Sequence, residues 1–466
     1  MPTGSVTRWG LLGGALLLPW AGVALLGDLA HGHVPRFLLL YFTAAALYLA
    51  ALVLAARGQG GRQTVRVIVI AAVLARVALL ATSPSLSSDA HRYRWEGRVQ
   101  LAGHNPYVTP PDAPVLSPLR DGSWLRVNHR EVPAIYGPAL QLLFRLLARL
   151  PGELLPFKLA FLACDLALFA LVLWGLRRRG LSPLWLVVYA WHPLALLETA
   201  GQAHLEVVPV LLLALAVELD ARGRARSAAL ALGTSIAAKY LALLVLPAFL
   251  LRGRSWRERA ERLALVGLPG LLCLLPFLAG GSQLGQGLSA YGGRWRFNDG
   301  GFWALDALLR ESGASAWFCR TLLPRLIDVP PGVDPGQHQT WLLILPKALV
   351  ALLVLGVLGW ASRPRPDDDL RPVALTAGGL FLALSPTVHP WYALWVLPFL
   401  PGAERREGRA AWLWLSLALP LSYVVLLRYS GLVGSWREEP AVRLAIWIPW
   451  AALLLWNWLP NHKAAR

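Results

Sequence analysis

The sequence predicts an all-α protein that crosses a membrane many times. Of its 466 residues, 56% are hydrophobic and only 15% are charged, whereas a soluble domain carries about 25% charged residues. Apolar runs long enough to cross a bilayer as helices, about 20 residues each, recur from end to end of the chain. The arginines concentrate in short polar links between these runs, as they do on the cytoplasmic side of membrane proteins. Together these observations predict a polytopic protein with about fourteen transmembrane helices.

The basic links determine the predicted topology. They are "RGQGGRQTVR" (57–66), "RRRG" (177–180), "ARGRAR" (221–226), "RGRSWRERAER" (252–262), "RPRPDDDLRP" (363–372) and "ERREGR" (404–409). We place these links and both termini inside the cell. The net charge of +18 then reflects membrane orientation. Nucleic acid is not expected as a partner, because the sequence offers no soluble basic domain.

The predicted crossings follow in order. Three of them, at 9–27, 37–56 and 67–82, leave the chain outside, where a long loop covers residues 83–153. The first is interpreted as a retained helix, because no small-residue cleavage site follows it. Further crossings are expected at 154–176, 181–200, 202–219, 263–280, 341–362, 410–428 and 441–459, with a second outer loop at 281–340. All belong to one domain, residues 1–466.

Two further stretches are expected to be hairpins of short helices. Residues 227–251 begin and end at basic inside links, so they must contain an even number of crossings, meeting near Lys239. The same reasoning gives residues 373–402 an apex at "TVHPWY". The segment 135–150 would reverse the topology if it crossed, so we interpret it as an amphipathic helix in the outer interface, beginning near Pro138.

Polar residues of the predicted outer side gather in four features. The stretch "SSDAHRYRWEGRVQLAGHNPYVTPPDAP" (87–114) follows the third crossing, and Lys239 and His389 mark the hairpin apices. The turn near 201–206 and the second outer loop add Gln202, His204, Glu206, Arg294, Arg296, Asn298 and Asp299. Ionisable groups at membrane depth are costly, so this convergence indicates a functional site.

Each of these residues also has a structural interpretation. Asp89 can act as a helix N-cap, the arginines that follow it can anchor lipid headgroups, and Glu206 can complement the positive end of a helix. "HPWYALW" has the composition of an interfacial aromatic belt. Lys239 differs from the others, because an ammonium among apolar residues requires a partner.

The stretch 87–114, followed by "AIYGPALQLLF" (134–144), resembles the first outer loop of polytopic GT-C glycosyltransferases. The closest resemblance is to bacterial polyprenyl-phosphate-mannose-dependent mannosyltransferases. "GTSIAAKYLALLVLP" (233–247) and "HPWYALWVLPFLP" (389–401) are similar to the lysine segment and the later aromatic hairpin of those enzymes, so the resemblance covers residues 70–402. Such loops often carry paired acids, whereas here Ser88 precedes Asp89. A second carboxylate must then come from Glu206 or Glu96.

The resemblance implies an inverting transferase. It would move a sugar, such as mannose or another hexose or pentose, from a polyprenyl-phosphate donor to a glycan, lipid or protein acceptor at the outer face of the membrane. It implies Asp89 as the general base, with Glu206 as a second catalytic residue. The donor phosphate is expected to contact Arg92, Arg94, Lys239 and His389. The residues expected to contact the sugar or acceptor are His91, Tyr93, Trp95, Glu96, Asn105, Tyr107, Tyr136, His204, Trp391 and Tyr392.

No cofactor is expected. A divalent metal is not favoured, because one clear carboxylate in the main motif is a poor site for a hard cation. The cysteines at 164, 273 and 319 lack metal-like spacing. Only four of the 44 basic residues are lysine, which is typical of GC-rich bacterial genomes and predicts an inner membrane with the site on its periplasmic or extracellular side. Two alternatives stay open: a transporter or flippase of lipid-linked substrates, and a ligase-like or polymerase-like protein of O-antigen type.

Overall fold

The computed structural model describes residues 3–363, 369–403, 407–429 and 436–458. Over these residues the chain consists of helices joined by turns and irregular connections, with an isolated parallel bridge between Phe297 and Thr387 and no named strand. The prediction of an all-α protein is therefore confirmed. Seven helical stretches in the described part of the chain are long and apolar enough to cross a membrane. The total of about fourteen crossings stays a prediction, because the other predicted crossings coincide with shorter or broken helices.

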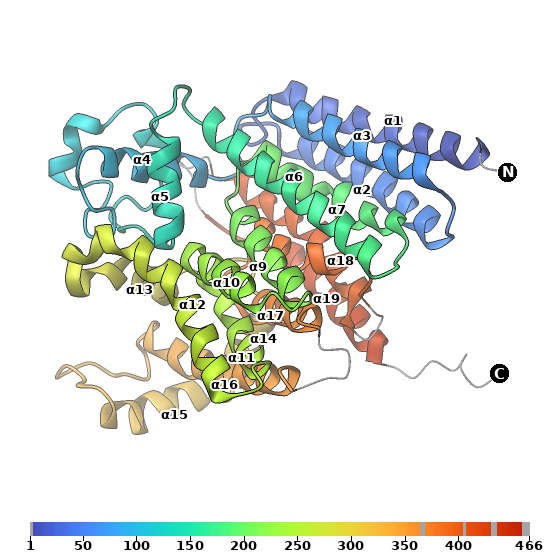
Figure 1. Cartoon of the computed structure of the whole chain (residues 1–466). Helices are drawn as coiled ribbons and strands as arrows, with labels where there is room; N and C mark the ends of the chain where they lie inside the picture. Colours follow the sequence, from blue (N-terminus) through green and yellow to red (C-terminus); the bar gives the residue numbers. More distant parts are fainter. Residues whose placement is uncertain (1–2, 364–368, 404–406, 430–435, 459–466) are drawn as a thin grey trace.

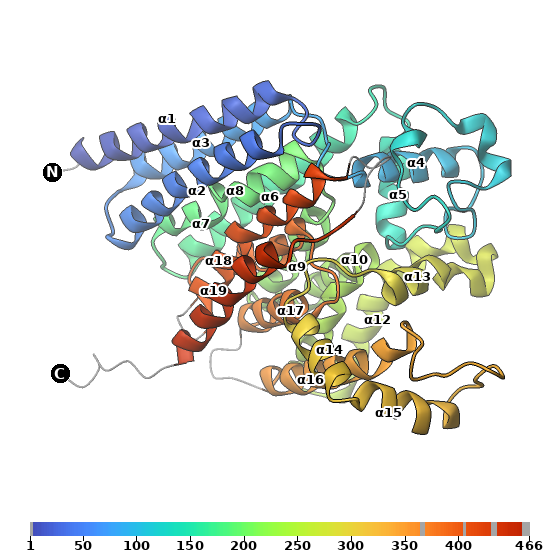
Figure 2. The same ribbon diagram turned by 180° about the vertical axis from the view of Figure 1, so that it is seen from behind.

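The first three helices form a bundle at one side of the molecule (Figures 1 and 2). They are α1 (Thr3–Leu26), α2 (Val34–Ala56) and α3 (Arg62–Leu79). Leu11, Leu18 and Leu25 of α1 are exposed by 71%, 72% and 88%. Their spacing of seven residues places them on one face of the helix. An apolar face this exposed is stable against lipid rather than water.

The predicted first outer loop contains two helices, α4 (Asp89–Leu101) and α5 (Pro138–Leu147), joined by irregular chain with two short 3-10 turns, η1 (Pro114–Leu119) and η2 (Trp124–Arg126). The predicted helix beginning near Pro138 is confirmed, with that proline in its first turn. The two helices pack closely at Gly97. A Cβ atom there would lie 2.4 Å from the carbonyl oxygen of Phe144, so only glycine permits this approach.

The long helix α6 (Leu155–Arg178) is followed by an apolar run that does not form one crossing. The prediction of a single helix at 181–200 is wrong. The run consists of η3 (Pro183–Leu186), α7 (Val187–Ala190), α8 (Pro193–Leu196) and a π-helical turn, η4 (Leu197–Gly201). Pro183 and Pro193 start new helical turns because proline cannot continue a helix. Residues 186–207 are all buried, so this run forms the core rather than a lipid-facing span.

Both predicted hairpins break where expected. Helix α9 (Val207–Asp220) leads to α10 (Ala225–Ala238), and Lys239 then adopts an extended conformation (φ −149°, ψ 128°) before η5 (Tyr240–Val245) and α11 (Leu246–Leu251). Helix α17 (Arg371–Leu384) ends before "SPTVH", and the chain resumes as η9 (Pro390–Trp395) and η10 (Leu397–Phe399). Both breaks therefore lie at the polar apices that the basic links predict.

The remaining elements complete the second half of the molecule. They are α12 (Trp256–Leu274), η6 (Leu275–Gly285), α13 (Gln286–Arg294), α14 (Gly301–Glu311), α15 (Ala314–Thr321), η7 (Leu323–Arg325), η8 (Trp341–Leu343), α16 (Ile344–Ala361), α18 (Arg409–Ala418), η12 (Leu419–Leu427) and α19 (Pro440–Trp458). The predicted second outer loop is thus largely helical. Helix α12 continues into α13 through a kink at Gly281, whose positive φ of 54° suits glycine.

The arrangement separates the two ends of the molecule. The N-terminal end of α1 and the turn between α2 and α3 lie together, whereas α4 and α5 lie at the opposite end (Figures 1 and 2). This separation agrees with a topology in which the basic link 57–66 and the first outer loop face opposite sides of a membrane. Which side is the cytoplasm stays a prediction.

Candidate active site

Asp89 is held in place by the turn that follows the broken apolar run. The amide oxygen of Gln202 accepts hydrogen bonds from the backbone N–H groups of Ser85 (3.0 Å) and Leu86 (2.9 Å). Leu29 N–H donates to the Ser85 hydroxyl at 2.8 Å. The segment that leads into α4 is thereby tied to the turn carrying His204 and Glu206, although more than a hundred residues separate them in sequence.

The carboxylate of Asp89 does not act as a helix cap. Ser88 is the N-cap residue of α4 and Asp89 is the first residue of the helix. Its Oδ2 atom accepts a long hydrogen bond from the Tyr93 hydroxyl at 3.5 Å. Burial raises the pKa of the half-buried carboxyl; the charges of His204 and Lys239 lower it, and that of Glu206 raises it further. Asp89 is therefore close to His204, Lys239 and Glu206, and its environment favours the protonated carboxyl over the carboxylate.

Lys239 lies at the break between α10 and η5. Its ammonium forms an ion pair with Glu206 and stands over the ring of Tyr392, 4.5 Å from the ring centre. The Tyr392 and Tyr291 hydroxyls form a 2.6 Å hydrogen bond. The Lys239 side chain is 20% exposed, whereas Glu206 is 2% exposed. Glu206 thus lies behind the lysine, and the ammonium keeps an accessible side.

We call Asp89, His204, Glu206, Lys239, Tyr291 and Tyr392 the Asp89 cluster. It draws on α4, the turn before α9, the α10–η5 junction, α13 and η9. The tertiary fold therefore brings together five segments that lie between Asp89 and Tyr392, about three hundred residues apart in the chain. A carboxylate with a raised pKa beside an accessible ammonium can accept a proton on one side and hold an anion on the other.

An aromatic stack borders this cluster. The His204 ring lies 3.7 Å from the Trp391 ring at 15°, and the His389 ring lies 4.4 Å from Trp391 at 3°. Two imidazoles this close to one indole on the same face would overlap, so they lie on opposite faces. Phe297 continues the stack, 5.0 Å from His389. Both faces of Trp391 are occupied, so stacking of Trp391 on a sugar requires displacement of an imidazole.

His389 joins the neighbourhood of Lys239 but not as a cation. Burial, together with the charges of His204 and Lys239, lowers its pKa to about 3. At neutral pH its imidazole is uncharged. Any contact with a phosphate would then be a single N–H hydrogen bond rather than an ion pair.

The arginines of α4 turn away from the Asp89 cluster. Arg92 is 6% exposed, pairs with Glu96 at 2.7 Å and donates to the carbonyl oxygens of Asn128, His129 and Val132. Arg94 donates to the Ser123 hydroxyl at 2.7 Å and lies near Asp121. A buried guanidinium must satisfy its N–H donors, and here the first outer loop supplies the acceptors. Arg92 and Arg94, which were predicted to bind the donor phosphate, therefore hold the first outer loop in place.

Glu96 is also absent from the cluster. Its second carboxylate oxygen accepts from the Gln141 side chain at 2.6 Å, which joins α4 to α5. Of the two candidates for a second carboxylate, Glu206 is the one that lies beside Asp89 and Lys239.

The remaining predicted contact residues divide into two groups. Tyr93 and Tyr136 pack edge to face at 5.1 Å beside Asp89. His91, Trp95, Asn105 and Tyr107 lie elsewhere: burial and the nearby arginines at 126 and 94 lower the pKa of His91 to about 4, and Trp95 packs in a small loop core. The Asn105 amide donates to Phe277 C=O at 3.0 Å, and the Tyr107 hydroxyl donates to Tyr136 C=O at 2.7 Å.

Two residues of the site were not predicted. Tyr291 belongs to the cluster through Tyr392, and Glu198 contacts His204 from behind. Glu198 carries a signal in the sequence, because it is the single acidic residue in the apolar run 181–200. A buried carboxylate in such a run requires partners.

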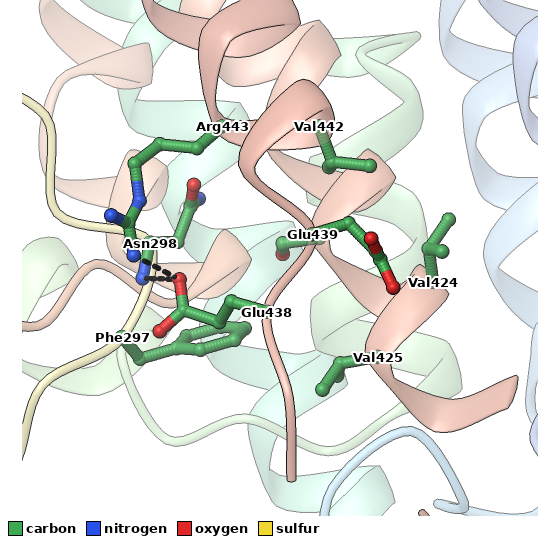
Figure 3. A pocket seen from close by; sticks show the side chains of 9 residues that line it. Phe297, Asn298, Val424, Val425, Glu438, Glu439, Val442 and Arg443 are labelled. Carbon is green, nitrogen blue, oxygen red and sulfur yellow. Dashed lines mark hydrogen bonds and ion pairs between the residues drawn. The ribbon is translucent and has the colours of Figure 1, made fainter. Parts of the chain in front are cut away.

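A separate small pocket lies beyond the aromatic stack. It is formed by the chain at Phe297 and Asn298 together with η12 and the start of α19 (Figure 3). Glu438 accepts hydrogen bonds from the backbone N–H of Asn298 and from Arg443, both at 2.8 Å. Phe297 contacts His389 as well as lining this pocket, so it stands between the pocket and the stack.

Cofactor candidates are few. Within the described ranges, no group of three or more His, Cys, Asp or Glu side chains is arranged to hold a metal ion. The three cysteines are free thiols. Metal dependence is therefore a matter for experiment.

Comparison with known proteins identifies the family. A profile described as alpha-(1->6)-mannopyranosyltransferase, N-terminal domain, matches residues 6–252, and that of glycosyltransferase family 87 matches residues 134–386. Alpha-(1->6)-mannopyranosyltransferase A of Mycobacterium tuberculosis is 25% identical over 413 residues, which cover 82% of this chain and 74% of that protein. Each profile covers more than half of the chain. The chain therefore belongs to the GT-C type membrane glycosyltransferases that these mannopyranosyltransferase and family 87 profiles describe.

Proposed function

We propose that the protein transfers a mannosyl residue from a polyprenyl-phosphate donor to a hydroxyl of a glycan or lipid acceptor, with inversion at the anomeric carbon. The site would face the periplasmic or extracellular side of the inner membrane. The observation that carries the proposal is the Asp89 cluster, in which a carboxylate with a raised pKa lies near a partly exposed ammonium. The names of the relatives add mannose as the sugar.

In the proposed mechanism, one side chain takes the proton of the attacking hydroxyl and another holds the leaving phosphate. The acceptor oxygen attacks the anomeric carbon on the face opposite the phosphate, and Asp89 takes the acceptor proton. The bond between the anomeric carbon and the phosphate oxygen breaks, and the lipid phosphate leaves with a second negative charge. Lys239 holds this phosphate and stabilises the added charge. No residue acts as a nucleophile, so the configuration inverts.

Glu206 serves this mechanism through Lys239. Its buried carboxylate orients the ammonium, and its charge helps to keep the pKa of Asp89 raised. Arg92 and Arg94 hold the first outer loop around α4, so the donor phosphate depends chiefly on Lys239 and on the hydroxyls of Tyr291 and Tyr392.

The test is transfer by the purified full-length protein in lipid. Mannosyl-phosphoryl-polyprenol with labelled mannose and an α-mannoside acceptor should give a new α-linked product, whereas guanosine-diphosphate mannose should give none. Label that crosses the bilayer without forming a new bond would support a transporter. Use of a lipid diphosphate donor alone would support the ligase-like alternative.

A further inference from the structure

Glu198 and His204 form a buried pair that the mechanism above leaves without a role. Both side chains are fully buried. His204 Nδ1 lies 2.8 Å from Glu198 Oε2, and the Tyr423 hydroxyl donates to Glu198 Oε1 at 2.9 Å. The carboxylate thus faces one ring nitrogen of His204 and restricts how the ring can turn.

The His204 ring is fixed by stacking as well. Trp391 covers one face at 3.7 Å, and Trp391 is itself covered by His389 on its other side. Both ring nitrogens of His204 and the Oε2 atom of Glu198 are buried, and none of the three makes a hydrogen bond of good geometry among the described residues, so the 2.8 Å approach of the two side chains is a close polar contact. Buried polar atoms without a hydrogen bond are uncommon, and this pair therefore calls for a functional explanation.

The backbone around this pair is unusual. Glu198 lies in the π-helical turn Leu197–Gly201, and Ala203 has a positive φ of 57°. Turns of the π type occur often at functional sites, and a positive φ in a residue other than glycine is strained. His204 and Glu206 follow within three residues of Ala203, and both act on Asp89 at the start of α4.

Resting on the proposed function, we propose that Glu198 is a positioning residue of the transfer reaction. It anchors His204, and the anchored imidazole supports the Trp391–His389 stack and acts on the general base Asp89. Glu198 itself does not touch the substrate, because its side chain is fully buried.

The influence on Asp89 is electrostatic. After burial, His204 is the largest single contribution to the pKa of Asp89, and it lowers that pKa. The other groups whose charges or hydrogen bonds act on Asp89, or feel it, are Ser87, Tyr93, Glu96, His129, Tyr136, Glu206, Lys239, Tyr291, Tyr392 and Tyr423. Of these groups, Tyr423 also donates to Glu198, whose carboxylate lies 2.8 Å from the His204 ring.

The test is the pH dependence of kcat/KM in the Glu198→Gln variant. The amide keeps the size of the side chain and the oxygen that accepts from Tyr423, but it removes the charge facing His204. Without that charge the His204 ring is held less firmly, so its lowering effect on the pKa of Asp89 weakens and that pKa rises. Because the reaction needs the basic form of Asp89, the acidic limb of the profile should move to higher pH by about one unit, the size typical of an adjacent opposite charge.

Tyr423→Phe is the matched control, since it removes one hydrogen bond to the same carboxylate and leaves the charge in place. It should lower the melting temperature without moving the acidic limb. A Glu198→Gln variant that loses melting temperature but keeps the wild-type limb would overturn the proposal and leave Glu198 a purely structural residue. If that variant does not fold, His204→Gln carries the same expected shift and the same opposing outcome.

The proposed function is tested separately in the same assay. Wild-type protein must transfer mannose from mannosyl-phosphoryl-polyprenol, and Asp89→Asn must abolish this. A wild type without transfer overturns both proposals. An active wild type with an unshifted Glu198→Gln profile overturns only the role of Glu198.

Discussion

At the scale of single residues, the environment of Asp89 distinguishes a catalytic carboxylate from a structural one. A capping aspartate would accept hydrogen bonds from the backbone of the first helical turn. Asp89 instead lies near His204, Glu206 and Lys239, which come from two other segments, and burial raises its pKa. Its neighbours on α4, Arg92 and Glu96, are satisfied by each other and by the first outer loop. Position on the same helix therefore does not make them part of one site.

Asp89→Asn should abolish transfer while the protein stays folded. The amide keeps the size of the side chain but cannot take the acceptor proton, and loss of a general base typically lowers the rate by about 10² or more. The measurement is kcat for mannose transfer at equal amounts of folded protein. Near-wild-type turnover would move the role of the base to Glu206.

The pH dependence of the wild type follows from the raised pKa of Asp89. A carboxylate acts as a base only when it is ionised, so the rate should fall as the pH drops through its pKa. Because that pKa is raised from its ordinary value of 3.8, the acidic limb should lie above that value. A profile of kcat/KM against pH measures it, and a limb at or below the ordinary value would contradict the environment seen for Asp89.

Lys239→Met should weaken donor binding, and Lys239→Arg should retain part of it because the charge remains. Methionine also leaves Glu206 buried without its partner, which typically costs about 3 to 5 kcal/mol of stability. The two effects are separated by the double variant Lys239→Met/Glu206→Gln. This variant should recover melting temperature but not donor affinity. Recovery of donor affinity as well would show that Lys239 is only the structural partner of Glu206.

At the scale of elements, the site depends on breaks rather than on long helices. Lys239, His389 and Glu198 lie at two interrupted helices and a π-helical turn. An uninterrupted helix would point its polar side chains along one face, whereas a break directs several of them to one point. Helices α4 and α5 then close over these breaks from the first outer loop.

The packing of α4 against α5 should not tolerate one additional carbon atom at Gly97. Gly97→Ala places a Cβ atom 2.4 Å from the Phe144 carbonyl oxygen, so one helix must move. Overpacking of this kind typically costs about 1 to 3 kcal/mol, and the displaced α4 should also reduce transfer. Melting temperature and kcat measure the two effects. Gly122→Ala in the same loop, where a Cβ atom meets nothing within 4 Å, should leave both unchanged.

At the scale of the whole molecule, the basic link 57–66 and the first outer loop lie at opposite ends (Figure 1). By the positive-inside rule we predict that the end with this link is cytoplasmic. On that prediction the Asp89 cluster opens toward the outer face, where lipid-linked sugars on that side would reach it.

Cysteine labelling tests this orientation in intact cells. In a background without the three native cysteines, Ser117→Cys should react with a membrane-impermeant thiol reagent, and Gln59→Cys should react only after the membrane is opened. Ser117 is exposed and Gln59 half-buried, so permeabilised cells supply the control for reactivity. The reverse pattern would invert the topology and place the site on the cytoplasmic side.

The sequence by itself determined the helical class, the polar apices and the breaks at Lys239 and before Pro390, because these follow from composition and from the parity of basic links. It also gave Asp89, His204, Glu206 and Lys239 as candidate residues of the site. Only the tertiary structure decided that these four lie together, while Arg92, Arg94 and Glu96 serve the loop. It also decided that the apolar run 181–200 is a buried, proline-broken core. The physical reason is that hydropathy is a local property of the chain, whereas the partner of a guanidinium or a buried carboxylate depends on which distant segment the fold places beside it.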